Sequence, residues 1–201
     1  RLDPVARRRP VAGEIAVEPG ASRVEGRPFL RILERGDGHG LALVEAGIDR
    51  FMLVGHSLGA YTAVLVAQAV PERVTRLVLE EPPVPPRTTQ DGRPIKPGGQ
   101  LRLRGAAPVT WLRCDPRLLG QVVAQLNDPQ PDWWAGLARI GVPTLVVAGG
   151  TLSHVSQRRQ ALLVESLPDA RLVKTYAGHR VHTKDYLAFS KAVLPFLTEA
   201  A

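Results

Sequence analysis

Residues 51–79 carry the pattern that most constrains the fold of this chain. An apolar run at 51–54 is followed by a helix-like stretch at 58–70, which Pro71 ends, and then by a second apolar run at 74–79. Strand, helix and strand in such short succession are typical of parallel strands joined by crossover helices. The pattern therefore predicts the α/β class, with a mostly parallel central sheet and flanking helices.

The same rhythm returns in the C-terminal part of the chain. Apolar runs at 144–148 and 170–176 predict strands, and a helix is expected between them at 157–167. A last helix is expected at about 184–199, because apolar residues recur on one face of that stretch. These residues are Tyr186, Phe189, Val193, Phe196 and Leu197. We expect this helix to close the fold.

Residues 1–40 differ from the rest of the chain in composition. They are rich in Arg, Gly and Pro and contain two short strand-like runs, at 14–17 and 28–33, with a Pro-Gly turn between them. We expect this segment to be an irregular leader with two candidate strands.

Residues 82–139 interrupt the sheet pattern. They begin with a proline-rich segment and contain short helical patterns at about 116–126 and 132–139. We expect this insertion to form a small cap or lid. The core is then expected to consist of residues 41–81 and 140–201.

The sequence Gly55-His56-Ser57-Leu58-Gly59 lies where the first predicted strand meets the first predicted helix. A Gly-x-Ser-x-Gly sequence in that place is the pattern of a nucleophile elbow, in which a strained turn exposes the serine hydroxyl. The helix N-terminus beside Ser57 would favour negative charge. The alternative is a glycine-rich junction without chemistry.

Beyond this motif, the sequence resembles the α/β-hydrolase superfamily over about residues 41–197. Residues 47–60 resemble the fifth strand and elbow of that family, and 71–79 resemble the run into the sixth strand. Residues 142–149 are similar to the seventh strand, and 170–179 to the eighth strand with its catalytic histidine loop. The resemblance implies a serine hydrolase that uses Ser57 as its nucleophile and needs no cofactor.

A serine nucleophile needs a base, and the family order is serine, acid and then histidine. His179 directly follows the strand-ending Gly178 and matches the family position for the base. His182 is the second candidate, although a capping or solvent-facing histidine explains it more simply. We therefore expect His179 to be the general base.

The acid departs from the usual family pattern. The position after the seventh strand where the family places it is Leu152, and no carboxylate occurs between Gly149 and Glu165. Some relatives, such as the haloalkane dehalogenases, place the acid at the end of the sixth strand, where this chain has Glu80 and Glu81. Strand alternation directs these two side chains to opposite faces. We expect Glu81 to be the acid, with Glu80 as the reserve.

An oxyanion hole needs two donors. The resemblance assigns one of them to the backbone N–H of Leu58. His39-Gly40 resembles the loop that usually carries the second donor, but it precedes Ser57 too closely for the intervening elements. We therefore expect the third and fourth strands of the family, and the second donor, to be absent. Weak activity, confined to activated esters, follows from that expectation.

Absence of those strands would leave one edge of the elbow strand without a partner, which is an aggregation hazard. Three accounts of that edge are open. The runs at 14–17 and 28–33 fill the gap, a second copy of the chain covers it in a homo-oligomer, or the chain is a truncated product.

The cap contains three tryptophans that could line an apolar substrate pocket together with His56 of the elbow: Trp111, Trp133 and Trp134. Packing of the cap is the alternative role for these tryptophans. The sequence has no metal-ligand spacing and no phosphate-binding glycine loop, so we expect no metal site.

Charge and composition bear on partners and location. The 201 residues carry a net charge of +7, but the 26 basic residues are scattered, which argues against a nucleic-acid partner. No apolar run is long enough to span a membrane. A single cysteine, Cys114, forms no internal disulfide, which fits a reducing compartment. We expect a cytoplasmic protein with a small-molecule substrate.

The sequence leads to two functional hypotheses. The first is an esterase-like serine hydrolase that cleaves small apolar carboxylic esters through an acyl-enzyme, with hydrolysis of carbon–carbon bonds and perhydrolysis as related chemistries. The second is a catalytically weak or inactive protein of the same fold that acts as a binding or interaction module.

Overall fold

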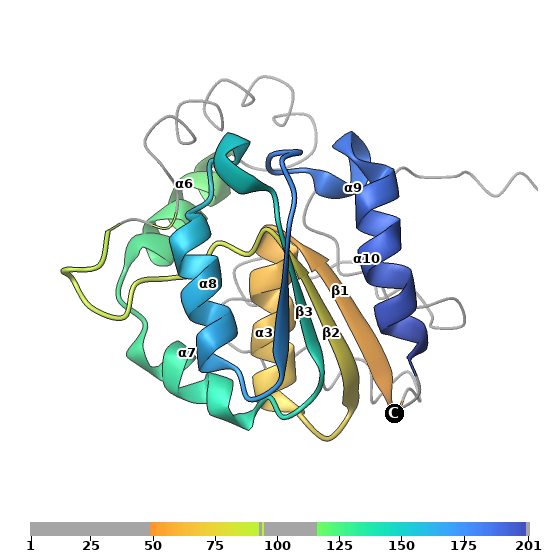
Figure 1. Cartoon of the computed structure of the whole chain (residues 1–201). Coiled ribbons are helices and arrows are strands. Elements are labelled where there is room, and N and C mark those ends of the chain that lie inside the picture. Colours follow the sequence, from red (N-terminus) through yellow and green to blue (C-terminus); the bar gives the residue numbers. More distant parts are fainter. Residues whose placement is uncertain (1–48, 93, 95–115, 200–201) are drawn as a thin grey trace, which may run out of the picture.

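The computed structural model describes residues 49–92, 94 and 116–199. A four-stranded parallel sheet with the order β1-β2-β3-β4 forms their centre (Figure 1). The strands are β1 (Phe51–His56), β2 (Val74–Glu80), β3 (Thr144–Ala148) and β4 (Ala170–Lys174). The predicted α/β class and the parallel sheet are confirmed.

Helices follow the strands as expected. They are α3 (Leu58–Ala69), α6 (Pro116–Asn127), α7 (Pro131–Gly136), α8 (Gln157–Ser166), α9 (Val181–Lys184) and α10 (Tyr186–Thr198). Two 3₁₀ turns, η1 (Leu137–Arg139) and η2 (Gly150–Leu152), follow α7 and β3. The described part of the predicted insertion therefore holds the helices α6 and α7 and the 3₁₀ turn η1, whereas its assignment as a cap stays a prediction.

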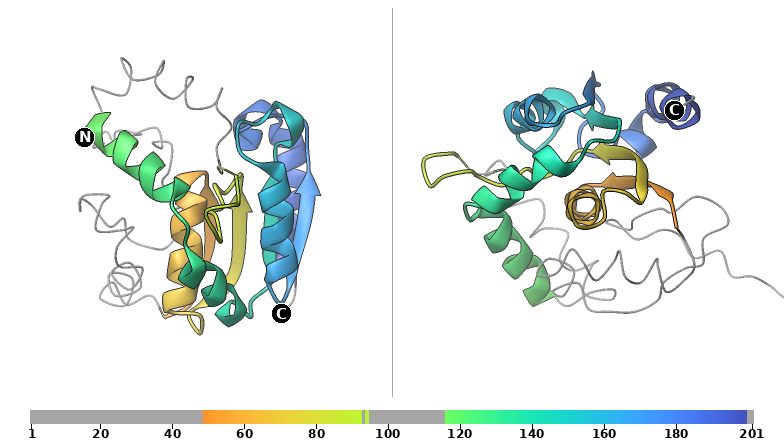
Figure 2. Two further views of the ribbon diagram at one scale, coloured as in Figure 1. Left: turned by 90° about the vertical axis from the view of Figure 1, so that its left-hand side faces the viewer. Right: turned by 90° about the horizontal axis from the view of Figure 1, so that it is seen from below.

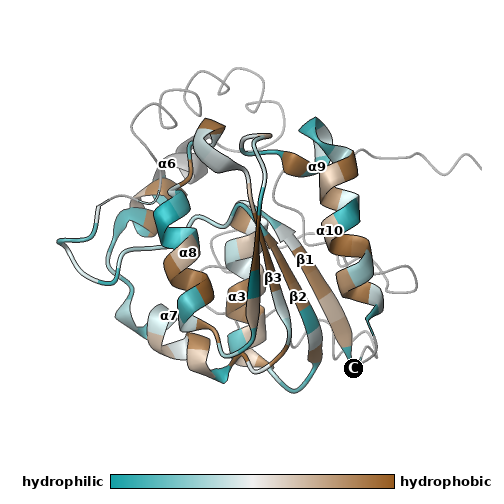
Figure 3. Ribbon diagram, in the orientation of Figure 1, coloured by the Kyte–Doolittle hydropathy of each residue, from teal (hydrophilic) through white to brown (hydrophobic). Residues whose placement is uncertain are grey.

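Helices cover both faces of the sheet. Alternate side chains of each strand point to opposite faces, so one strand contributes to two apolar clusters. Leu77 and Leu79 of β2 belong to the apolar cluster that contains residues of α3, α7 and α8. Val78, between them, packs in a second cluster with Val193 and Phe196 of α10. Figure 2 shows α10 on the side of the sheet opposite α3. The hydrophobic colouring of the strands between these helices in Figure 3 matches this arrangement.

The last predicted helix, at about 184–199, is confirmed by α10. Asp185 separates α10 from α9, and its carboxylate accepts a hydrogen bond from the N–H of Ala188 at 3.1 Å, so that it caps α10. Val193 and Phe196 are buried as expected, but Tyr186 is 65% exposed. Tyr186 belongs to the predicted apolar face but stays exposed, because it lies in the first turn of α10, before the part of the helix that meets the apolar cluster.

Among the described residues, β1 pairs with β2 on one side only. The strand-like runs at 14–17 and 28–33 and the helical stretch at 41–46 lie outside those residues. The accounts of the β1 edge, including the homo-oligomer, therefore stay predictions. No helix in the described part of the chain is long and apolar enough to cross a membrane.

The first testable consequence concerns the core. Leu77 has no exposed surface and pairs with Leu53 across β1 and β2. Leu77→Ala should lower the free energy of unfolding by about 2–5 kcal/mol, because it removes buried methyl groups and leaves a cavity. Urea denaturation followed by circular dichroism measures the change.

The same substitution on the surface is the control. Leu187 is 69% exposed, so Leu187→Ala should change the unfolding free energy by less than about 0.5 kcal/mol. Equal effects of the two substitutions would contradict the packing described here.

Candidate active site

Ser57 stands at the turn between β1 and α3. Its backbone has φ 56° and ψ −122°, in the positive-φ region that non-glycine residues rarely adopt. The turn is tight: a Cβ on Gly55 would lie 2.5 Å from the carbonyl oxygen of Gly59. The N–H of Ser57 donates to the carbonyl of Glu80 at 2.8 Å and fastens the turn to β2. This is the strained strand-to-helix turn that the motif predicts.

Leu58 is the first residue of α3. The first four N–H groups of a helix have no partner within the helix, and the helix dipole makes that end attractive to negative charge. The N–H of Leu58 therefore belongs to a group of donors beside the Ser57 hydroxyl. Its role as an oxyanion donor stays a prediction.

His179 lies between a hydroxyl and a carboxylate. Its Nε2 is 2.9 Å from Oγ of Ser57, and its Nδ1 is 3.3 Å from Oε2 of Glu81. The preceding Gly178 has φ +77° and turns the chain after β4 toward the other two residues. The structure thus brings together the three residues that the sequence singled out as nucleophile, base and acid.

Glu81 is fully buried and accepts four hydrogen bonds besides that of His179. The N–H of Gly149 donates at 2.5 Å, Nε2 of Gln157 at 3.0 Å and Nε2 of Gln160 at 3.2 Å. The hydroxyl of Ser153 donates to the other carboxylate oxygen. All four of these donors come from the segment after β3, where the family usually places its acid. In this chain the segment contributes no acid, and it binds the carboxylate of Glu81, which follows β2, through these hydrogen bonds.

These contacts determine the charge of Glu81. Burial, the largest influence, would raise the pKa of the carboxyl group. Hydrogen bonds from His179, Ser153, Gln157 and the N–H of Gly149 oppose it, and their combined effect lowers the pKa below its ordinary value of 4.5. Glu81 is therefore ionised at neutral pH.

Glu80 points the other way, as strand alternation predicts. Its carboxylate accepts hydrogen bonds from Nδ1–H of His182 at 2.7 Å and from the N–H of His182 at 3.0 Å. The two reserve candidates, Glu80 and His182, thus pair with each other, on the face of the sheet opposite the donors of Glu81. Sequence reasoning did not find this pair, because its members are 102 residues apart.

Two more imidazole rings contact His179. The Nε2–H of His56 donates to the backbone carbonyl of His179 at 2.7 Å, and the two ring centroids are 4.7 Å apart. The ring of His154 lies 4.1 Å from that of His179. Burial, the largest influence, lowers the pKa of His56. His56 therefore supports the loop that carries His179, and its assignment to a substrate pocket stays a prediction.

The tryptophans of the predicted pocket lie in the core. Trp133 is 5% exposed and stacks on Tyr61 with ring centroids 5.9 Å apart. Trp134 is 9% exposed, and its indole N–H donates to the carbonyl of Pro85 at 3.0 Å. These contacts agree with the packing alternative. Trp111 lies outside the described residues.

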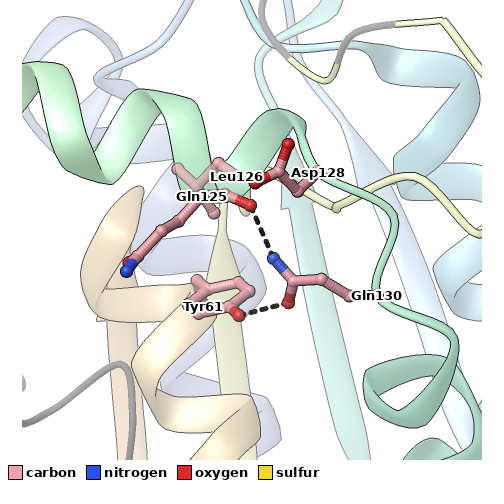
Figure 4. Close-up of a pocket in the computed structure, with 5 residues that line it drawn as sticks. All are labelled: Tyr61, Gln125, Leu126, Asp128 and Gln130. Carbon is pink, nitrogen blue, oxygen red and sulfur yellow. Dashed lines mark hydrogen bonds between the residues drawn. The ribbon is translucent and has the colours of Figure 1, made fainter. Parts of the chain in front are cut away.

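A cavity of about 230 Å³ opens where α3 meets the end of α6 (Figure 4). It is lined by Tyr61, Gln125, Leu126, Asp128 and Gln130. The Tyr61 hydroxyl donates to Oε1 of Gln130 at 2.5 Å, and burial raises the pKa of Tyr61 to about 12. Ser57, His179 and Glu81 are not among the lining residues, so this cavity is separate from the group they form.

Comparisons with known proteins agree on the fold. A family model described as "alpha/beta hydrolase fold" matches residues 42–116. The mouse (Lyso)-N-acylphosphatidylethanolamine lipase is 35% identical over 95 residues, which are 46% of this chain and 25% of that protein. A protein from Pseudomonas savastanoi named "Putative carbamate hydrolase RutD" is 42% identical over 64 residues, which are 31% of this chain. The chain thus spans about a quarter of the length of each of these two curated relatives.

Solved structures resemble a larger part of the chain. A hydrolase from Pseudomonas aeruginosa superposes with a TM-score of 0.56 at 24% identity and covers 84% of this chain and 72% of its own. A carboxylesterase from Bacillus subtilis superposes with a TM-score of 0.56 at 22% identity over 85% of this chain and 67% of its own.

The lowered pKa of Glu81 makes stability depend on pH. A carboxyl group with a lowered pKa stabilises the folded state above its ordinary value of 4.5, and this contribution is lost as the pH falls through the lowered pKa. From about pH 6 to about pH 3, the unfolding free energy of the wild type should fall more steeply than that of Glu81→Gln. Urea denaturation at each pH measures it.

Glu165→Gln is the matched control, because Glu165 is exposed and the substitution removes the same group. This variant should keep the pH dependence of the wild type. A wild-type profile in Glu81→Gln would show that the hydrogen bonds of Glu81 do not stabilise its ionised form.

Proposed function

The chain has the α/β-hydrolase fold, and from this fold we propose that it is a serine hydrolase whose triad is Ser57, His179 and Glu81. One observation carries the proposal: the imidazole of His179 is 2.9 Å from the Ser57 hydroxyl on one side and 3.3 Å from the Glu81 carboxylate on the other. A serine hydroxyl needs such a base, and the base needs such a carboxylate, for nucleophilic attack on an acyl group.

In the first half of the reaction, Oγ of Ser57 attacks the acyl carbon while Nε2 of His179 takes the hydroxyl proton. The negative charge that develops on the carbonyl oxygen is stabilised by the N–H of Leu58 at the start of α3. His179 then gives the proton to the leaving alcohol, and the acyl group stays on Ser57. In the second half, water replaces the alcohol by the same steps in reverse and releases the acid.

Glu81 stabilises the imidazolium that forms when His179 holds the proton. An ionised carboxylate next to Nδ1–H favours that charged form and keeps the ring in the tautomer that leaves Nε2 free to accept a proton. The donors on Glu81, among them Ser153 and Gln157, hold its carboxylate in place and ionised. They are positioning residues in this proposal.

Carboxylic esters are the proposed substrate class. The similarity to a carboxylesterase and to a lipase supports this choice. Two apolar residues in the segments after β3 and β4, Leu152 and Tyr176, are 68% and 78% exposed. They follow β3 and β4 at the carboxyl edge of the sheet, where His179 also lies, and could contact the apolar part of an ester.

A fluorophosphonate probe tests whether Ser57 is an activated nucleophile. The folded wild-type protein should be labelled covalently, because the probe reacts with a serine that a neighbouring base activates. Ser57→Ala should abolish labelling, and Ser190→Ala, which removes a serine hydroxyl from α10, should retain it. Mass spectrometry of the intact protein measures the adduct. A folded wild-type protein that stays unlabelled would refute the proposal.

The assignment of the acid is tested on the hydrolysis of nitrophenyl butyrate. Glu81→Gln should lower kcat by several hundredfold or more with little change in KM, because the amide no longer stabilises the imidazolium. Glu80→Gln, the matched change on the neighbouring residue, should lower kcat by less than about tenfold. A larger loss in Glu80→Gln than in Glu81→Gln would transfer the role to Glu80.

A further inference from the structure

Three side chains outside the proposed triad come together at the carboxyl edge of the sheet. They are His56 at the end of β1, Glu80 at the end of β2 and His182 in α9, and each offers a ligand atom within 4.8 Å of the other two. We propose that these three residues bind a divalent transition-metal ion of the Zn²⁺ type. This site goes beyond the proposed hydrolase function and does not depend on it.

The donor set suits such an ion. Two imidazole nitrogens and one carboxylate are ligands that Zn²⁺ takes in proteins, with a fourth position left for water. Bonds of about 2.0–2.2 Å in a tetrahedral site put ligand atoms about 3.4 Å apart. The largest separation between ligand atoms must therefore shrink by up to about 1.4 Å. His182 can make this movement, because its side chain is 37% exposed and lies in the short helix α9.

The hydrogen bonds around the cluster prepare two of its members for a metal. His56 donates its Nε2–H to the carbonyl of His179 at 2.7 Å, so Nδ1 of that ring carries the lone pair. Metal-binding histidines usually donate their other N–H to a backbone carbonyl or a carboxylate in this way. Glu80 is only 2% exposed, and a carboxylate so deeply buried needs a hydrogen-bond donor or a cation beside it.

In the metal-free protein, Nδ1–H of His182 donates to the Glu80 carboxylate at 2.7 Å. A metal ion would replace that proton: the Nδ1–H bond breaks, the proton moves to Nε2 of the same ring, or to solvent where Nε2 already carries one, and Nδ1 and the carboxylate both bond to the ion. Metal binding therefore preserves the link between β2 and α9 that this hydrogen bond now makes.

The proposal has a consequence for the triad, which, unlike metal binding itself, rests on the proposed function. The ring of His56 contacts the rings of both His182 and His179, at 4.9 and 4.7 Å. A dication bound to His56 would repel the imidazolium that His179 becomes when it takes the Ser57 proton. Metal binding should therefore inhibit hydrolysis.

Isothermal titration calorimetry with Zn²⁺ tests the binding, on the full chain purified without a histidine tag. We expect saturable binding of one ion in the micromolar range. Removal of a ligand in His182→Ala or in Glu80→Gln should weaken this binding by more than about 100-fold, since outer-shell changes alone cost about 10–100-fold. Circular dichroism verifies that both variants fold.

His154→Asn is the control, because it removes a histidine that contacts His179 but does not belong to the cluster. It should bind Zn²⁺ as the wild type does. No saturable binding by the wild type, or unchanged affinity in folded His182→Ala and Glu80→Gln, would overturn the proposal.

Inhibition is measured separately, with each rate compared with the metal-free rate of the same variant. Zn²⁺ at saturation should lower the wild-type rate at least fivefold, because the bound dication disfavours the imidazolium form of His179, and should not lower that of His182→Ala. Equal inhibition of both would overturn the consequence for the triad. A protein without hydrolase activity would refute the proposed function and leave the calorimetric result standing.

Discussion

The parallel pairing of β2 with both β1 and β3 is the interaction on which the site depends. Its register sets His56 opposite Glu80 and Glu80 opposite Val147, so that the three strands end at one level. Two hydrogen bonds continue the pairing beyond the strands, from the N–H of Ser57 to Glu80 and from the N–H of Glu81 to Val147. Side chains that come from distant parts of the sequence therefore meet at one edge.

That pairing also holds two unfavourable features in place. Ser57 and Glu81 both have positive φ, at 56° and 52°, which costs about 1–3 kcal/mol for each residue. Glu81 in addition carries a charge with no exposed surface. Backbone hydrogen bonds to neighbouring strands offset the strain, and the donors of the segment after β3 offset the burial of charge. The same contacts keep the carboxylate ionised beside His179.

Much of this arrangement could be predicted because its signals are local. The alternation of apolar runs and helical stretches predicted the four strands of the described residues to within a few residues, and the elbow pattern located Ser57. The short helix α9 before Asp185 was not predicted, because four residues are too few to show an apolar periodicity. Tyr186 belongs to the apolar stripe of α10 in sequence but remains exposed, since periodicity describes a face of the helix and not what covers it.

The sequence by itself determined the fold class, the serine at the strand-to-helix turn and the histidine after the last strand, because each depends on short-range pattern and chain order. Only the tertiary structure decided which of two adjacent glutamates faces His179. It also supplied the donors Ser153, Gln157 and Gln160, and it grouped His56, Glu80 and His182. The residues that these groups bring together are far apart in the chain: His56 and His182 are separated by 126 positions. Strand register and the two faces of the sheet bring them together, and no spacing along the chain encodes either.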